Sequence, residues 1–477
     1  MAIIITMIIM ILIIAGNYKE INIMFKKILI ANRGEIAVRV IRACRDMGII
    51  SVAVYSEADR DSMHSNIADE SLCIGGAMAK DSYLNLRAII TAAQISGADA
   101  IHPGYGFLSE NTVFVKLCEE NNIKFIGPNA KSIALMGNKA EAKIMMQKSG
   151  VPVIPGSDGA VYNLPEAEDI CDKIGYPVMI KASGGGGGRG IRLVSDKNAL
   201  KNAYNMCKAE AKASFGNDDI YIEKFIENPR HIEIQILADE HGKIIYLFER
   251  DCSLQRRHQK IMEEAPSVFM DENLRRKMGD AAIKATKAAN YFNAGTVEFL
   301  VDKNKNFYFM EMNTRIQVEH PVTEFITGID IVKQQIKIAA GEPLELAQSD
   351  VKLLGHAIEC RINAEDPDKN FAPCPGKITE LNVPGGPGVR VDSAVYQGYN
   401  IPPYYDSMIS KLIVFGNNRD EAIARMRRAL AEYLFEGIIT NVDYQIELLS
   451  TEEFQTGDFN INFVDEYNKR RRENING

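Results

Sequence analysis

The order of apolar and polar residues near the start of the chain predicts alternating strands and helices. Residues 27–31 form a short apolar run, as expected of a buried parallel strand. A helical stripe follows at Ile36, Val40, Ile41 and Cys44. The next apolar run spans residues 50–55, and the alternation continues to residues 125–128. We therefore predict a doubly wound α/β unit over the first hundred or so residues.

The pattern changes twice after this unit. From about Met136 to Asp350, strand pairs joined by short turns alternate with helices, which is typical of an α+β arrangement. Residues 355–415 carry strand patterns with many Gly and Pro, and helical periodicity returns from Arg419 to Leu449. A length of 477 residues allows about three domains. The predicted fold class is α/β followed by α+β.

Composition and charge exclude several classes of function. The net charge is −8, so no global positive field exists to attract nucleic acid or an anionic membrane. The eight cysteines include no CxxC pair, which argues against a structural zinc site and favours reduced thiols in a cytoplasmic protein. No GxGxxG phosphate loop follows the first predicted strand, and the GxxxxGK[ST] phosphate loop is absent from the whole sequence. An anionic ligand would therefore need a local basic pocket of another kind.

The first 23 residues differ from the rest. Residues 1–15 are apolar apart from Thr6, but this run is too short to span a bilayer and lacks a basic segment before it. We expect this extension not to belong to the fold and translation to start at Met24.

A hairpin in the second half of the chain carries oxygen ligands. An extended segment from Glu311 to Glu319 would place its odd-numbered side chains, Glu311, Asn313, Arg315, Gln317 and Glu319, on one face. The preceding strand, residues 295–301, would bring Glu298 towards Glu311. Two carboxylates and an amide oxygen suit Mg²⁺ bound together with phosphates. A strand that merely exposes polar side chains to solvent is the alternative.

Two further segments could bind anions. Five glycines at residues 184–188 follow Lys181 between two apolar runs, so their backbone N–H groups can cover phosphates; a flexible linker is the alternative. Residues 249–260 contain four cations and His258, although such charge runs usually form a solvated face. Within this run, Cys252 is interpreted as a bystander thiol. His102 could line a cleft, but a structural role is at least as plausible.

Four stretches resemble biotin carboxylase. They read EMNTRIQVEHP at 311–321, KASGGGGGRG at 181–190, ANRGEIA at 31–37 and HPGYGFLSEN at 102–111. The resemblance extends from about Met24 to residue 465. It implies an N-terminal α/β domain (24–137), an ATP-grasp core (138–350, with a glycine-rich lid at about 152–226) and a C-terminal α+β domain (351–468). Cys374 stands where a small residue such as Ser would be unremarkable.

The resemblance also implies roles for individual residues in the carboxylation of biotin with ATP and bicarbonate. It implies ATP contacts at Lys139, Lys181, Gly187, Gly188, Glu223, Lys224, Phe225, Ile226, His231, His258, Glu298 and Glu311. Glu298, Glu311 and Asn313 would bind Mg²⁺ or Mn²⁺. Bicarbonate would meet Lys260, Arg315, Gln317 and Val318. Glu319 would be the general base, and Arg361 would stabilise the biotin enolate, with Lys260 and Arg315 assisting catalysis.

The sequence contains no Met-Lys-Met biotin-acceptor motif. Biotin is therefore expected on a separate biotin carboxyl carrier protein, with carboxyltransferase subunits as further partners and a homodimer implied by the resemblance. Acetyl-CoA carboxylase in fatty acid biosynthesis is the expected context, and a pyruvate or propionyl-CoA carboxylase is the alternative. Another ATP-grasp ligase, such as a carbamoyl-phosphate or purine-pathway synthetase, and a non-catalytic nucleotide-binding regulator are the remaining alternatives.

Overall fold

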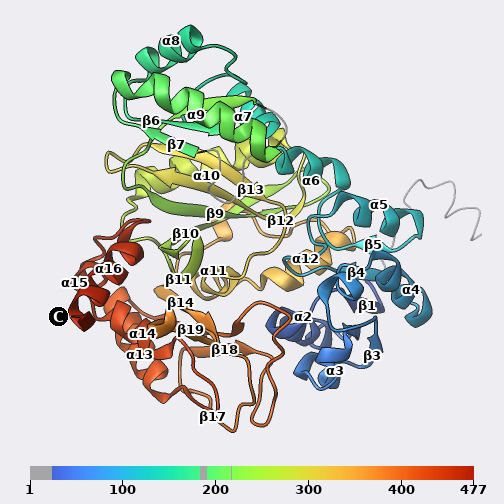
Figure 1. The fold of residues 1–477 in the computed structure, drawn as a ribbon. Coiled ribbons are helices and arrows are strands. Elements are labelled where there is room, and N and C mark those ends of the chain that lie inside the picture. Colours follow the sequence, from blue (N-terminus) through green and yellow to red (C-terminus); the bar gives the residue numbers. More distant parts are fainter. Residues whose placement is uncertain (1–23, 183–190, 216–217, 477) are drawn as a thin grey trace, which may run out of the picture.

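Three sheets carry most of the structure, a computed structural model that describes residues 24–182, 191–215 and 218–476 (Figure 1). The apolar extension at 1–23 and the glycines at 184–188 lie outside the described residues. Within the described part, no helix is both long enough and apolar enough to cross a membrane. None of the eight cysteines, all within the described residues, forms a disulfide, which agrees with the prediction of reduced thiols.

The first sheet has five parallel strands in the order β3-β2-β1-β4-β5. Neighbouring residues of β1 point to opposite faces, so Ile28 packs in one apolar cluster with α2 while Leu29 packs in another with α4 and α5. The predicted doubly wound α/β unit is confirmed. Its elements are β1 (Lys27–Ile30), α2 (Gly34–Asp46), β2 (Ile50–Tyr55), α3 (Met63–Ile67), β3 (Glu70–Cys73), α4 (Leu86–Ser96), β4 (Ala100–His102), α5 (Thr112–Glu120), β5 (Lys124–Phe125) and α6 (Ala130–Gly137).

A small three-stranded sheet, in the order β7-β6-β8, forms a unit with its own core. That core consists of buried residues between Val161 and Ile222 and is covered by α8 and α9 (Figure 1, top). Strands β6 and β7 pair antiparallel with Lys181 opposite Ile191, so the glycines join two strands of a hairpin, as predicted. The elements are α8 (Leu164–Ile174), β6 (Val178–Ala182), β7 (Ile191–Val194), α9 (Lys197–Phe215) and β8 (Ile220–Lys224). The preceding helix, α7 (Lys139–Lys148), packs in a different apolar cluster through Ala142 and Met146.

The third sheet has eight strands in the order β13-β12-β9-β10-β11-β14-β19-β18. It continues without a break past residue 350, because β11 pairs antiparallel with β14. Groups from both sides of that residue can therefore meet on one sheet face. The strands are β9 (Arg230–Ala238), β10 (Ile244–Arg256), β11 (Gln259–Ala265), β12 (Asn293–Val301), β13 (Phe307–Asn313), β14 (His356–Asn363), β18 (Val389–Ser393) and β19 (Met408–Gly416).

Helices cover this long sheet, and several of them begin at side-chain caps. Asp271, Asp330 and Asn418 each accept a hydrogen bond from a backbone N–H of the first turn that follows. The helices are α10 (Glu272–Ala288), α11 (His320–Thr327), α12 (Ile331–Ala339), α13 (Arg419–Glu432), α14 (Val442–Leu449), α15 (Glu452–Thr456) and α16 (Phe463–Asn476). The remaining elements are the strand pairs β15 (Glu365–Asp366) with β16 (Ala372–Pro373) and β17 (Glu380–Asn382) with β20 (Leu434–Glu436), and the 3₁₀ turns η1 (Glu57–Asp59), η2 (Ala79–Asp81), η3 (Gln348–Asp350) and η4 (Pro367–Lys369).

A buried aspartate joins the N-terminal unit to the C-terminal core. Asp59 accepts two hydrogen bonds from the Arg33 guanidinium, at 2.6 and 2.8 Å, and one from the Tyr83 hydroxyl at 2.6 Å. Its other contact, at 3.4 Å, is with the hydroxyl of Tyr399, which belongs to the C-terminal core. Burial alone would raise the pKa of Asp59, but the hydrogen bond and charge of Arg33 hold that pKa below its ordinary value.

We predict that Asp59→Asn lowers the free energy of unfolding by about 3 kcal/mol, because it leaves the Arg33 guanidinium buried without its counter-charge. A lowered native pKa stabilises the fold above the ordinary carboxyl pKa, and this stabilisation is lost as pH falls through the lowered value. The difference in free energy of unfolding between Asp59→Asn and the wild type should therefore become smaller as the pH is lowered. Thermal melts at several pH values test this, with Asp61→Asn at an exposed position as the control. Equal melting temperatures at neutral pH would contradict it.

Candidate active site

The hairpin of β12 and β13 places two acidic side chains side by side. Glu298 and Glu311 are directly opposite in the register of the two strands, as predicted. The prediction of an extended chain as far as Glu319 is wrong, because β13 ends at Asn313 and α11 begins at His320. Residues 314–319 instead bend out of the sheet, and Ile316 fills the apolar cluster beneath α2. The bend lets Glu319 turn back towards the sheet.

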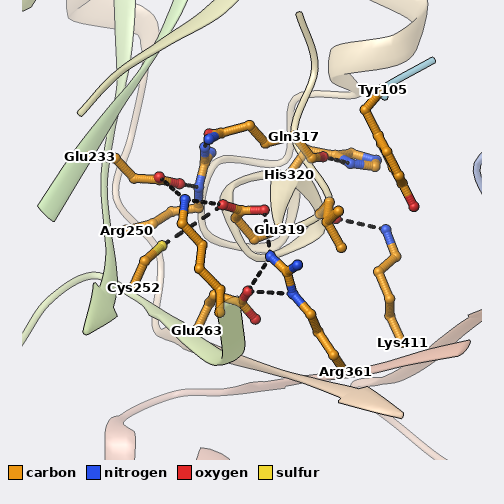
Figure 2. A network of polar contacts seen from close by, with 12 residues as sticks. Tyr105, Glu233, Arg250, Cys252, Glu263, Gln317, Glu319, His320, Arg361 and Lys411 are labelled. Carbon is orange, nitrogen blue, oxygen red and sulfur yellow. Dashed lines mark hydrogen bonds and ion pairs between the residues drawn. The ribbon is translucent and has the colours of Figure 1, made fainter. Parts of the chain in front are cut away.

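The ammonium of Lys260 lies at the centre of the site. It donates to Glu233 at 2.6 Å, to Glu319 at 2.6 Å and to Glu298 at 3.1 Å. The lysine comes from β11 and the carboxylates from β9, β12 and the turn before α11. Figure 2 shows Glu319 at the middle of this network, with Glu233 on one side and Arg361 on the other.

Burial and charge act in opposite directions on these groups. Burial would raise the pKa of Glu319, but Lys260, Arg361 and Arg250 hold it far below its ordinary value. The pKa of Glu298 is likewise held well below the ordinary value against its burial, chiefly by Lys260 and His231. Burial would lower the pKa of Lys260, and the surrounding anionic groups raise it well above the ordinary value instead. Glu319 and Glu298 are therefore ionised, and Lys260 is protonated.

A fully buried arginine supports the network from behind. Arg250 donates from all three guanidinium nitrogens to acceptors on β9, on β12, in the turn before α11 and on α11 itself. Figure 2 shows two of these acceptors, Glu233 and Gln317. The acceptors are Glu233 at 2.5 Å, Gln235 at 2.7 Å, Gln317 at 2.7 Å, Thr323 at 2.9 Å and Thr296 at 3.1 Å. The interpretation of residues 249–260 as mainly a solvated face is wrong for Arg250.

Two cations approach from β14 and β19. The guanidinium of Arg361 contacts Glu263 at 2.7 Å through Nε and Glu319 at 3.0 Å through Nη2. Lys411 is fully buried and donates to the backbone carbonyl of Val318 at 2.7 Å. Arg361 and Glu319, predicted to act in the same reaction, are thus in direct contact (Figure 2).

A cavity of about 830 Å³ lies between the small unit and the long sheet. Lys139, Lys143, Lys181 and Glu223 line it, with Tyr221 and Phe309. Glu223 accepts from Lys181 at 2.7 Å and from Lys143 at 2.8 Å, which hold its pKa below the ordinary value against its burial. Three lysines around one cavity suit a polyanionic ligand.

None of the other predicted ATP contacts within the described residues lines this cavity. The ammonium of Lys224 donates to the carbonyls of Gly175 and Tyr176, and half-buried Phe225 and Ile226 follow it at the end of β8. His231 contacts Glu298 at 2.9 Å through Nε2, while its Nδ1 meets the Gln255 amide at 2.7 Å. His258 is exposed on the turn between β10 and β11. Gly187 and Gly188 lie outside the described residues.

Arg315 lies at the edge of the site. It donates to Glu110 at 3.0 Å and to the Asn313 side-chain oxygen at 2.8 Å. The Asn313 amide in turn donates to Glu298 at 2.8 Å, and the Gln317 amide donates to the same Glu298 oxygen at 2.7 Å. The predicted bicarbonate residues therefore connect to the predicted metal ligands through direct hydrogen bonds.

The predicted metal ligands fit a hard cation. Glu298 and Glu311 offer carboxylate oxygens from paired strands, Asn313 offers an amide oxygen, and Glu311 is partly exposed and paired with Lys139 at 3.0 Å. His231, Glu233 and Glu298 also lie close enough together to share an ion, as do Glu233, Cys252 and Glu319. Those two groups are less suitable, because the Lys260 ammonium contacts both carboxylates of each group, whereas it contacts only Glu298 of the first set.

Several site residues were not predicted. Glu110, Lys143, Glu233, Arg250 and Glu263 each bind a predicted residue directly. The alternation of Glu233 and Gln235 with isoleucines in β9 was a usable signal, because it puts two polar side chains on one strand face. His102 is fully buried, accepts from the Gly104 N–H and contacts Gln335, which supports its structural interpretation.

Three family models match consecutive parts of the chain. They are the biotin carboxylase N-terminal domain over residues 24–133, the ATP-binding domain of the carbamoyl-phosphate synthase L chain over 138–347, and the biotin carboxylase C-terminal domain over 359–466. Biotin carboxylase 1 of Bacillus subtilis is 58% identical over 445 residues, which cover 93% of this chain and 99% of that relative. The chain belongs to the biotin carboxylase family.

Other members of the family extend the comparison. One of the pyruvate carboxylase subunits of Methanothermobacter thermautotrophicus is 55% identical over 94% of this chain and 91% of its own length. A biotin carboxylase-βγ-ATP complex from Campylobacter jejuni matches with a TM-score of 0.86 and 52% identity, covering 93% of this chain and 99% of that one. The biotin carboxylase domain dimer of Hydrogenobacter thermophilus 2-oxoglutarate carboxylase, in complex with MgADP, ADP and bicarbonate, matches with a TM-score of 0.85 and 51% identity over 93% and 98% of the two chains.

We predict that Arg250→Lys lowers the free energy of unfolding of this biotin carboxylase family member by about 3 kcal/mol. Lysine keeps the charge but has fewer N–H donors than acceptors to satisfy, so buried acceptors lose their hydrogen bonds. Urea unfolding monitored by circular dichroism measures the effect. Arg257→Lys, on the exposed turn beside His258, is the matched control and should leave stability unchanged. A stable Arg250→Lys variant would show that the guanidinium fork is dispensable.

Proposed function

We propose that the chain uses ATP and bicarbonate to carboxylate biotin on a separate carrier protein, through carboxyphosphate. The observation that carries the proposal is the position of Glu319, whose carboxylate contacts Lys260 at 2.6 Å and Arg361 at 3.0 Å. The Glu319 carboxylate thus contacts Lys260, a cation suited to bind bicarbonate, and Arg361, a cation suited to stabilise an enolate. The 830 Å³ cavity lined by lysines supports ATP as the phosphate donor.

In this proposal Glu319 removes the bicarbonate proton. A carboxylate with a strongly lowered pKa is a weak base, so the field of its cations must be partly cancelled before it acts. Bicarbonate bound to Lys260 and Arg315 brings a negative charge to those cations. That charge raises the proton affinity of Glu319 at the moment when bicarbonate attacks.

The bonds change in two stages. A bicarbonate oxygen bonds to the γ-phosphorus of ATP, the bond to the bridging oxygen breaks, and ADP leaves with its electron pair. Carboxyphosphate then divides into CO₂ and phosphate, and phosphate takes the ureido N–H proton of biotin. Arg361 stabilises the enolate oxygen while the ureido nitrogen attacks CO₂. Lys181 and Lys139 are proposed to hold the ATP phosphates throughout.

Glu298, Glu311 and Asn313 are proposed to hold Mg²⁺ or Mn²⁺. When bound, the ion would neutralise charge on the ATP phosphates. The complex of the Hydrogenobacter thermophilus domain with MgADP supports a magnesium ion bound together with the nucleotide. Glu311 is suited to the ion because its carboxylate is partly exposed and its partner Lys139 is a surface side chain, 77% exposed.

We propose acetyl-CoA carboxylase in fatty acid biosynthesis as the context, with a biotin carboxyl carrier protein and carboxyltransferase subunits as partners. Pyruvate is the second candidate acceptor, because a 55% identical relative carries the name of a pyruvate carboxylase. The dimeric Hydrogenobacter thermophilus domain supports a homodimer. Affinity purification followed by mass spectrometry distinguishes these contexts by the carboxyltransferase that is recovered.

Glu319→Gln is expected to lower bicarbonate-dependent ATP cleavage at least about a hundredfold, because the amide cannot accept the proton. Glutamine keeps the size of the side chain, so the dissociation constant of ATP should change little. Phosphate release and nucleotide binding by calorimetry measure the two quantities. Turnover at the wild-type rate would exclude Glu319 as the base.

Glu298→Gln is expected to weaken the apparent affinity for Mg²⁺ by about tenfold or more, since a neutral amide replaces an ionised metal ligand. A titration of ATP cleavage with Mg²⁺ at fixed ATP gives this quantity. Glu120→Gln, on exposed helix α5, is the control and should titrate as the wild type does. An unchanged Mg²⁺ requirement in Glu298→Gln would remove this residue from the metal site.

A further inference from the structure

A second pair of buried carboxyl groups lies behind Arg361. Glu263 on β11 and Glu359 on β14 are directly opposite each other in the antiparallel register. Side chains of such cross-strand pairs share one sheet face, with Cβ atoms about 5 Å apart. Glu359 is fully buried, and neither of its carboxyl oxygens has a hydrogen-bond partner among the described residues. Oε2 of Glu263 also lacks one within that part of the chain.

Glu263 binds one side of the Arg361 guanidinium. Nε of Arg361 donates to Oε1 of Glu263 at 2.7 Å, and Nη2 contacts the same oxygen at 2.5 Å. Nη2 also reaches Glu319, while Nη1 makes no hydrogen bond to any residue that the structure describes. Glu263 thus binds the guanidinium through Nε and Nη2, which leaves Nη1 for a ligand. Glu263 lies to the left of the Arg361 guanidinium in Figure 2.

We propose that Glu263 and Glu359 form a carboxyl pair with a single negative charge, and that this pair positions Arg361 for the biotin-dependent step. Two buried carboxylates so close together would repel each other, so one holds a proton. Because only Glu263 contacts Arg361, Glu263 carries the charge and Glu359 the proton. The inference rests on the proposed carboxylation of biotin and makes both glutamates positioning residues.

The surroundings of the pair agree with this assignment. Burial raises the pKa of Glu263 to about 7 despite Arg361, and burial raises the pKa of Glu359 well above the ordinary value despite Lys411. The charged or titratable groups around the pair are Lys260 on β11, Arg361 on β14, Lys411 on β19, Glu319 before α11 and Tyr105 after β4. Cys360 packs in the apolar cluster on the opposite face of β14. Each of the three cations already contacts another carboxylate, since Lys260 contacts Glu233 and Glu298, Arg361 contacts Glu319, and Lys411 contacts Glu35 at 3.3 Å. Among the described residues, none of them is left to pair with Glu359.

The test compares two rates of the full chain with free biotin as the probe. One rate is bicarbonate-dependent ATP cleavage without biotin, and the other is the same rate with saturating biotin. Their ratio, the biotin stimulation, is measured between about pH 6 and 9. In the wild type the biotin stimulation should fall as pH decreases through about 7, because protonated Glu263 no longer holds Nε and Nη2 of Arg361 by charge.

Glu263→Gln should lower biotin stimulation by about tenfold and remove its acid limb, while ATP cleavage without biotin changes less than about threefold. Glu359→Gln replaces a neutral acid with a neutral amide of the same shape, so its stimulation at neutral pH should stay within about twofold of wild type. Glu264→Gln is the matched control. Glu264 is the next residue of β11, equally buried, and pairs with His356 and Arg419 on the other face. Its variant should keep wild-type stimulation at every pH.

The inference is overturned if Glu263→Gln retains wild-type stimulation with its acid limb. It is also overturned if Glu359→Gln loses as much biotin stimulation as Glu263→Gln does. If Glu263→Gln does not fold, a loss of biotin stimulation of about tenfold in Glu359→Gln overturns it as well. The proposed function fails in a different way, since wild-type protein would then show no bicarbonate-dependent ATP cleavage that biotin stimulates.

Discussion

Three buried carboxylates share one ammonium group, that of Lys260, and the geometry of the site depends on this contact. Without the cation, three like charges would repel in a medium of low polarity, and at least one would take up a proton. The ammonium instead offsets this repulsion and draws together β9, β11, β12 and the turn before α11. Glu319 is held by that turn rather than by a strand, so its position is set by charge as much as by backbone hydrogen bonds.

Much of the fold and part of the site could be predicted from local patterns. The doubly wound unit follows from short apolar runs that alternate with helical stripes, and the pairing of Glu298 with Glu311 follows from a hairpin with a five-residue loop. Both depend on neighbours in sequence. The sheet that continues past residue 350 does not, because β11 and β14 are separated by nearly a hundred residues and three helices.

The missed residues share a physical cause. Arg250 reads as part of a charged run, and its burial is stabilised only by acceptors that come from other strands and from α11. The extended prediction through Glu319 failed for a related reason, since alternation along a segment cannot reveal that Ile316 packs under α2. Period-2 patterns report which side chains could share a face, whereas tertiary packing decides where the strand ends.

An acidic chain can hold anionic substrates only if its cations are concentrated, and concentrated cations repel one another. Four cations of the site have carboxylate partners: Lys143 and Lys181 share Glu223, Lys139 contacts Glu311, and Arg315 contacts Glu110. These pairs position the cations and lower their mutual repulsion. An incoming phosphate or bicarbonate must compete with those carboxylates, which moderates its affinity while the cation positions stay fixed. Binding therefore becomes an exchange of partners around charges that are already in place, and little reorganisation is left for the transition state.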